Sequence, residues 1–80
     1  MTSNNAVEFI FDTLQGTPEG SILFFKPDNA KADFNTPIKT DDSGRQIILK
    51  QDLFNGLYIV KIDWKQNGNH YFKEERIRIN

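Results

Sequence analysis

Residues 56–79 read GLYIVKIDWKQ, then NG, then NHYFKEERIRI, and this stretch decides the fold. Two segments rich in β-branched and aromatic residues flank Asn67-Gly68, a dipeptide that favours a type I′ two-residue turn. Such a turn fixes the register of a hairpin, so Gln66 is expected opposite Asn69 and Trp64 opposite Tyr71. The stretch therefore predicts a long antiparallel hairpin.

One face of this hairpin is mostly apolar, and we predict that it faces the core. Alternate residues of a strand lie on the same side of a sheet. On this side they are Tyr58, Val60, Ile62, Trp64, Tyr71, Ile77 and Ile79. The same register places Lys73 and Glu75 on the core face. These two charges are expected either to extend to the rim of the sandwich or to be redirected by a β-bulge.

The opposite face of the hairpin mixes aliphatic, aromatic and basic residues, namely Leu57, Ile59, Lys61, Phe72, Arg76 and Arg78. Lys61 is expected across from Glu74, a cross-strand pair that contributes about 0.2–1 kcal/mol. Two interpretations of this face remain open. Either another strand or a loop covers it, or it is a docking surface for a partner.

Upstream of the hairpin, turn residues separate further segments with a period of two. Strands are expected over residues 6–13, 19–26, 33–40 and 45–51, and Pro37 places the third at an edge or a bulge. Asp41-Asp42-Ser43-Gly44 predicts a tight hairpin turn in which Gly44 takes a positive φ. We therefore predict one domain over residues 6–80, preceded by a disordered or artificially added segment at residues 1–5.

The start of the strand at residue 56 carries a more specific signature. Leu53, Gly56 and Tyr58 together resemble the tyrosine corner of immunoglobulin-like sandwiches, in which the tyrosine hydroxyl bonds to backbone just upstream. Gly56, Tyr58 and Trp64 are therefore assigned structural roles. The predicted fold class is all-β, an immunoglobulin-like antiparallel β-sandwich of about six to seven strands.

The composition gives little support to catalysis or to nucleic-acid binding. Ten basic and eleven acidic residues leave a net charge of −1, which provides no field to attract nucleic acid. The chain has no cysteine and one histidine, His70, so we predict no catalytic residue, no metal site and no cofactor. No apolar run approaches the length of about 20 residues that spans a bilayer. A non-enzymatic binding role is expected, and the oligomeric state stays open.

Three segments of the chain carry a family resemblance. They read GSILFFKPDN at residues 20–29, LFNGLYIVKIDW at 53–64 and GNHYFKE at 68–74, with Asp33-Phe34 between the first two. In this order they resemble the extracytoplasmic domain of the FixH (CcoH-like) family, especially its Bacteroidetes branch. The resemblance covers about residues 6–79.

The resemblance implies a non-catalytic assembly factor for a haem–copper cytochrome oxidase of the cbb type, linked to copper delivery. Its partners would be integral membrane proteins, namely oxidase subunits and a copper-transporting ATPase. The domain would lie on the extracytoplasmic side of a bacterial inner membrane, anchored by an N-terminal helix that this chain lacks. The alternative is a secreted immunoglobulin-like module that binds carbohydrate or another macromolecule.

Overall fold

A computed structural model describes residues 5–80, with the side chain of Gln15 excepted. Within this range six strands form, and the only helical segments are three 3₁₀ turns of three residues each. The strands are β1 (Ala6–Ile10), β2 (Glu19–Phe25), β3 (Phe34–Pro37), β4 (Arg45–Leu49), β5 (Gly56–Gln66) and β6 (Asn69–Ile79).

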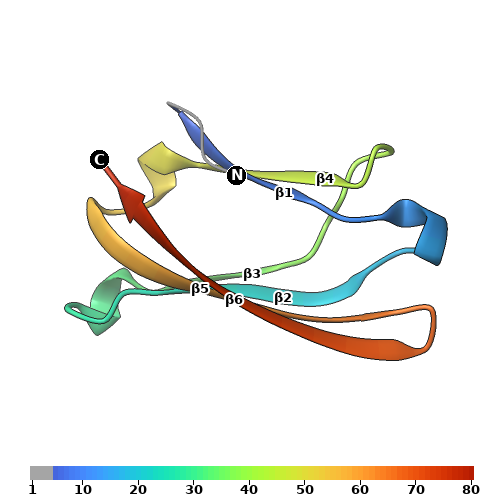
Figure 1. Ribbon diagram of the computed structural model, residues 1–80. Helices are drawn as coiled ribbons and strands as arrows, with labels where there is room; N and C mark the ends of the chain where they lie inside the picture. The colour runs from blue at the N-terminus through green and yellow to red at the C-terminus, as the bar shows by residue number, and fades with distance from the viewer. Residues whose placement is uncertain (1–4) are drawn as a thin grey trace.

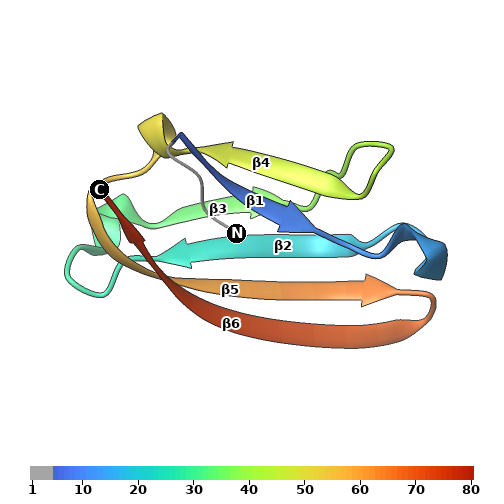
Figure 2. The same ribbon diagram turned by 45° about the horizontal axis from the view of Figure 1, so that its top comes forward.

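The strands form two antiparallel sheets of unequal width. The smaller sheet contains β1 and β4, and the larger has the order β3-β2-β5-β6. Figures 1 and 2 show the small sheet lying over one side of the large sheet, above β3, β2 and β5. The predicted all-β sandwich is therefore confirmed. Pro37 lies in the edge strand β3, as its missing N–H requires.

The hydrophobic core lies between the two sheets. Val7 and Ile48 point into it from the small sheet, and Ile22, Phe24 and Tyr58 from the large one. Three aromatic side chains pack around the Phe24 ring, with centroids 5.9 Å from it: Phe9, Phe34 and Tyr58. Phe9 and Tyr58 meet the Phe24 ring edge to face, and Phe34 is tilted against it. Such aromatic contacts add to the free energy gained by burial.

The β5–β6 hairpin has the predicted register, with Gln66 opposite Asn69 and Trp64 opposite Tyr71. Asn67 and Gly68 both take positive φ, 53° and 76°, as a type I′ turn requires. One part of the core-face prediction is wrong, because the side chain of Tyr71 is 40% exposed. The small sheet has two strands and does not reach over β6, so a residue can face the core side without being covered.

The turn at residues 41–44 was predicted to close a hairpin, and that prediction is wrong. Gly44 takes the expected positive φ of 80°, and its N–H donates to the Asp41 carbonyl over 3.0 Å. The strands on either side of the turn do not pair with each other, however, because β3 pairs with β2 and β4 with β1. The segment therefore carries the chain from one sheet to the other. Alternation in a sequence shows that a strand forms and does not show which strand it pairs with.

The ends of three strands also differ from prediction. The first strand ends at Ile10, and residues 13–15 form a 3₁₀ turn, for which Asp12 accepts a hydrogen bond from the Leu14 N–H over 2.9 Å. β3 and β4 are likewise shorter than expected. Of the segment predicted to be disordered or added, residues 1–4 lie outside the described range. Asn5 is described, and its carbonyl accepts a hydrogen bond from the Lys50 N–H over 2.9 Å.

Candidate binding surfaces

The outer face of the large sheet, on the side away from the small sheet, brings together all six residues predicted as a partner surface. The register puts Leu57 opposite Arg78 and Ile59 opposite Arg76. β2 extends this face, because Leu23 lies opposite Lys61 and Phe25 opposite Ile59. We call this surface the outer face and define it by Leu23, Phe25, Leu57, Ile59, Lys61, Phe72, Arg76 and Arg78.

The aliphatic centre of the outer face is surrounded by exposed aromatic and cationic groups. The Phe72 side chain is 60% exposed, and Arg76 and Arg78 are exposed further along β6 on the same side. Lys61 lies opposite Glu74 as predicted, and its ammonium is 5.3 Å from the centroid of the Phe25 ring. At the turn end of this face, His70 Nε2 lies 2.5 Å from Asp63 Oδ1. Asp63 and Glu74 lie on the same side as Phe72, so charges of both signs border the apolar area of the outer face. A polar, charged rim around an apolar centre is common at protein interfaces.

Within residues 5–80, no element packs on the outer face. The small sheet lies on the opposite side, and Figure 1 shows no other strand on the outer side of β2, β5 and β6. Leu57 and Ile59 are half-buried. The interpretation that another strand or loop covers this face therefore finds no support in the described part of the chain.

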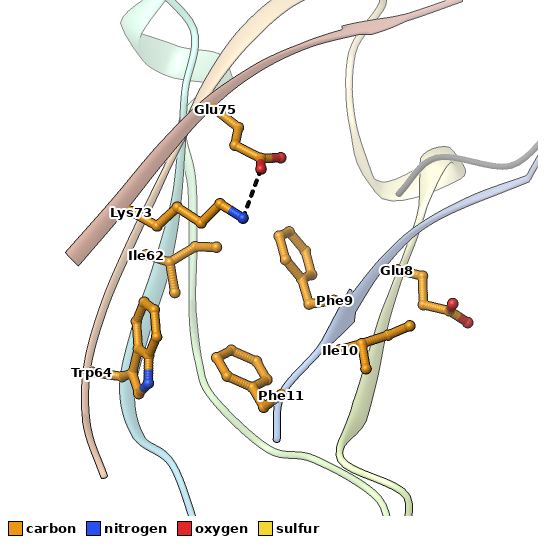
Figure 3. A pocket seen from close by; sticks show the side chains of 8 residues that line it. All are labelled: Glu8, Phe9, Ile10, Phe11, Ile62, Trp64, Lys73 and Glu75. Carbon is orange, nitrogen blue, oxygen red and sulfur yellow. Dashed lines mark ion pairs between the residues drawn. The ribbon is translucent and has the colours of Figure 1, made fainter. Parts of the chain in front are cut away.

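A groove runs along the open side of the sandwich, between β1 and β6. It has a volume of about 340 Å³ and is lined on its apolar side by Phe9, Phe11, Ile62 and Trp64. Figure 3 shows Phe9 and Phe11 pointing towards Ile62 and Trp64, whereas Glu8 and Ile10 point away from the groove. The Phe11 and Trp64 rings meet edge to face, with centroids 5.5 Å apart.

Lys73 and Glu75 stand at the β6 side of this groove. Both lie on the core face, and their side chains remain about half exposed because the small sheet stops short of them. Lys73 Nζ is 3.0 Å from Glu75 Oε1, the ion pair drawn in Figure 3. The register of the hairpin is continuous through both residues, so the rim placement is correct and the bulge alternative is not.

Tyr58 is a buried residue whose hydroxyl joins two parts of the chain. The side chain is fully buried, its hydroxyl accepts a hydrogen bond from the Phe54 N–H, and it donates one to the Ala32 carbonyl, each over 3.1 Å. The bond to Phe54, four residues upstream, is the predicted corner contact. The bond to Ala32 was not predicted, since it joins segments far apart in the sequence.

Lys26 is the residue that sequence reasoning missed. Its side chain is 5% exposed, and Nζ lies 2.6 Å from Asp28 Oδ1 and 5.9 Å from the centroid of the Tyr58 ring. Gly56 has φ of 119°, and a Cβ there would lie 2.9 Å from Lys26 Nζ. The hydrogen bond from Lys26 holds the pKa of Asp28 below its ordinary value. Gly56 therefore leaves room for a buried cation beside the tyrosine corner.

Among the side chains that could carry chemistry, His70 and Asp63 form a close pair on the outer face. Within the described residues, no group of three or more His, Asp or Glu side chains is placed to hold a metal ion. Trp64 donates from Nε1 to Gln66 Oε1 over 3.2 Å and stacks on Tyr71, so its polar group is used inside the fold.

Comparison with protein-family models, with curated proteins and with solved structures found no match to this chain. None of the helical segments described here has the length and apolar character needed to cross a membrane.

Proposed function

We propose that this domain is a non-catalytic binding module of immunoglobulin-like type, which docks a protein partner through the outer face of its large sheet. The observation that carries the proposal is an uncovered face in which Ile59 lies opposite Arg76 and Phe72 is 60% exposed. A sheet face that only contacted water would gain nothing from exposing a phenylalanine there.

The immunoglobulin-like assignment rests on the order and pairing of the strands. In chain order, β1 to β6 match strands B, C, C′, E, F and G of such a sandwich, because B and E share one sheet and C′, C, F and G share the other. Tyr58, near the start of the strand that corresponds to F, occupies the place of the corner tyrosine. Strands equivalent to A and D are not among those described.

The chemistry of the outer face indicates the kind of partner. Aromatic residues and arginine contribute most of the binding energy at protein interfaces, and a buried aromatic anchor contributes about 2 kcal/mol or more. Phe72 would be such an anchor, and Arg76 follows four residues further along β6 on the same side. The matching surface would present an apolar pocket for Phe72 and, further along, carboxylates that face Arg76 and Arg78.

The FixH-like resemblance gives this proposal a specific form. The domain would be the extracytoplasmic part of a membrane-anchored assembly factor, and the outer face would contact an oxidase subunit or the copper-transporting ATPase. This assignment is supported by the three sequence segments alone. The geometry supports a binding role of the same general class.

The test compares Ile59→Glu and Phe72→Glu with a matched control, Ile47→Glu. Ile47 is 51% exposed and lies on the far side of the sandwich, in the outer side of the small sheet. Circular dichroism should show that all three variants are folded. Binding to purified oxidase subunits and to the copper ATPase, measured by surface plasmon resonance, should fall roughly tenfold or more in the first two variants only.

Two results would contradict the proposal. If the folded Ile59→Glu and Phe72→Glu variants bind and support oxidase assembly like the unchanged domain, the outer face is not the interface. If the domain binds none of these membrane proteins but binds glycans, the secreted module is the better assignment.

A further inference from the structure

β6 is an eleven-residue edge strand whose outer side is unpaired in the described part of the chain. The two-residue turn makes Gln66 and Asn69 a hydrogen-bonded pair, and such pairs recur at every second residue. Odd-numbered residues of β6 therefore direct their N–H and C=O groups towards β5. The even-numbered ones direct theirs outward: His70, Phe72, Glu74, Arg76 and Arg78.

We propose that β6 pairs antiparallel with β6 of a second copy of this chain, around a two-fold axis at Glu74. Pairing through the outward groups places even-numbered residues opposite even-numbered ones, which keeps the two core faces on the same side. Glu74 is the middle residue of Asn69–Ile79, so this register pairs the whole strand. The two large sheets join into one, and the two outer faces become continuous.

Charge complementarity on the core side of β6 supports this occupant. With the axis at Glu74, Lys73 lies opposite Glu75 of the second copy, and Glu75 lies opposite its Lys73. Both side chains are already about half exposed at the rim, within reach of a neighbouring strand. Tyr71, stacked on Trp64 and 40% exposed, lies opposite Ile77 of the second copy and gains an apolar cover. Cross-strand pairs of both kinds stabilise antiparallel sheets.

The β6 residues on the outer face also fit this pairing of two copies. Phe72 lies opposite Arg76 of the second copy, an arrangement that allows a cation–π contact. The two Glu74 side chains meet at the axis, and this repulsion is reduced because each lies opposite Lys61 of its own chain and diagonal to Arg76 of the other. Shifting the axis to Glu75 would instead bring two carboxylates together on the core side and shorten the overlap.

Charges that point inward on an edge strand normally prevent sheets from joining, because pairing would bury them without partners. In β6 the inward charges are one cation and one anion, spaced so that a reversed copy of the same strand matches both. A partner strand with another charge pattern would leave Lys73 or Glu75 without an opposite charge, whereas a second β6 matches both. The edge is therefore selective for its own sequence.

The first experiment uses charge reversal and sedimentation velocity over a range of concentrations. The unchanged domain should dimerise. Lys73→Glu and Glu75→Lys each turn two attractive contacts into two repulsive ones, and each should weaken the dimer roughly tenfold or more. A mixture of the two variants restores both opposite-charge contacts between unlike chains and should form a heterodimer, although neither variant has an intact Lys73–Glu75 pair of its own.

The second experiment determines the register by oxidative cross-linking. The chain has no cysteine, so a single introduced thiol reports one position. Glu74→Cys places its two copies directly across the axis, where the Cα separation of about 5.5 Å in a hydrogen-bonded pair permits a disulfide. Glu75→Cys and Lys73→Cys, the matched controls, should cross-link much less. If Glu75→Cys cross-links efficiently and Glu74→Cys does not, the two-fold axis lies at Glu75, and the proposed register is wrong.

A monomer at every concentration up to the millimolar range would overturn the proposal, and so would a mixture of the two charge variants that remains monomeric. These readouts are independent of partner binding. Lys73→Glu leaves Ile59 and Phe72 unchanged, so this variant should still bind an outer-face partner. If it does not, the edge of β6 and the outer face do not act as separate binding surfaces.

Discussion

β5 and β6 belong to one hairpin and have eleven residues each, yet the protein uses them differently. In β5, Tyr58, Val60 and Ile62 are buried, whereas in β6 only Ile79 is. The difference arises outside the hairpin, because the small sheet covers β5 and ends before β6. Burial of a strand is thus set by the width of the sheet that faces it.

Because of this difference, we expect β5 to contribute mainly to the stability of the fold and β6 mainly to binding. Side chains of β5 lose their contact with water on folding, and each contributes to the free energy of unfolding through burial. Those of β6 keep much of that contact, so they contribute little to folding and remain available for contact with another molecule. We expect substitutions in the two strands to have correspondingly different effects.

The largest difference is expected between two tyrosines. Tyr58→Ala removes a fully buried ring and should lower the free energy of unfolding by about 3–5 kcal/mol. Tyr71→Ala removes a half-exposed ring stacked on Trp64 and should lower it by about 0.5–1.5 kcal/mol. Urea unfolding followed by tryptophan fluorescence measures both. Equal losses would show that β6 contributes to the core as much as β5 does.

A smaller effect isolates the hydroxyl of the corner tyrosine. Tyr58→Phe keeps the ring and leaves the Phe54 N–H and the Ala32 carbonyl without their partner, which should cost about 1–2 kcal/mol. Tyr71→Phe is the control, and its effect should stay within about 0.5 kcal/mol. An unchanged denaturation midpoint for Tyr58→Phe would show that the hydroxyl does not contribute to the free energy of unfolding.

The fold was predictable where local sequence decides it, and less so where distant segments meet. The Asn67-Gly68 turn fixes its own register, and the corner at Tyr58 depends on a bond only four residues away. The placement of β4 beside β1 depends instead on long-range contacts. Gln46, for example, holds the crossing segment by accepting from the Lys39 N–H over 3.0 Å and donating to the Pro37 carbonyl over 3.1 Å.

The candidate surface was predictable to a similar degree. Because a strand has a period of two, the register alone puts Ile59, Phe72 and Arg76 on one face. Whether that face is covered depends on which strands form the second sheet, and alternation carries no information on that point. The exposure of Tyr71 and the burial of Lys26 escaped prediction for the same reason.

Backbone exchange should reveal the two sides of β6 directly. In a dilute sample, the amides of Phe72, Glu74 and Arg76 point away from β5 and should exchange roughly tenfold or more faster than those of Lys73 and Glu75. Hydrogen exchange measured by NMR tests this residue by residue. Uniformly slow exchange along β6 in monomeric samples would show that its outer edge is already paired.

The smallest expected effect concerns acid, and it contrasts the hairpin turn with the turn at residues 41–44. Asp41 Oδ1 accepts hydrogen bonds from the Arg45 and Ser43 N–H groups, each over 2.9 Å, and from the Ser43 hydroxyl over 2.7 Å. These bonds hold the pKa of Asp41 below its ordinary value of 3.8. Asn67-Gly68 contains no titratable group and should not respond to acid.

The sign of the acid effect follows from that lowered pKa. A carboxyl with a lower pKa in the folded state than in the unfolded state stabilises the fold above pH 3.8, and the contribution is lost as the pH falls through the folded value. Asp41→Asn should therefore reduce stability at pH 7 and make the loss between pH 4 and 2, roughly, shallower than in the unchanged domain. Thermal unfolding at a series of pH values measures both slopes. Parallel curves for the two proteins would mean that the acid response of the fold comes from other carboxylates.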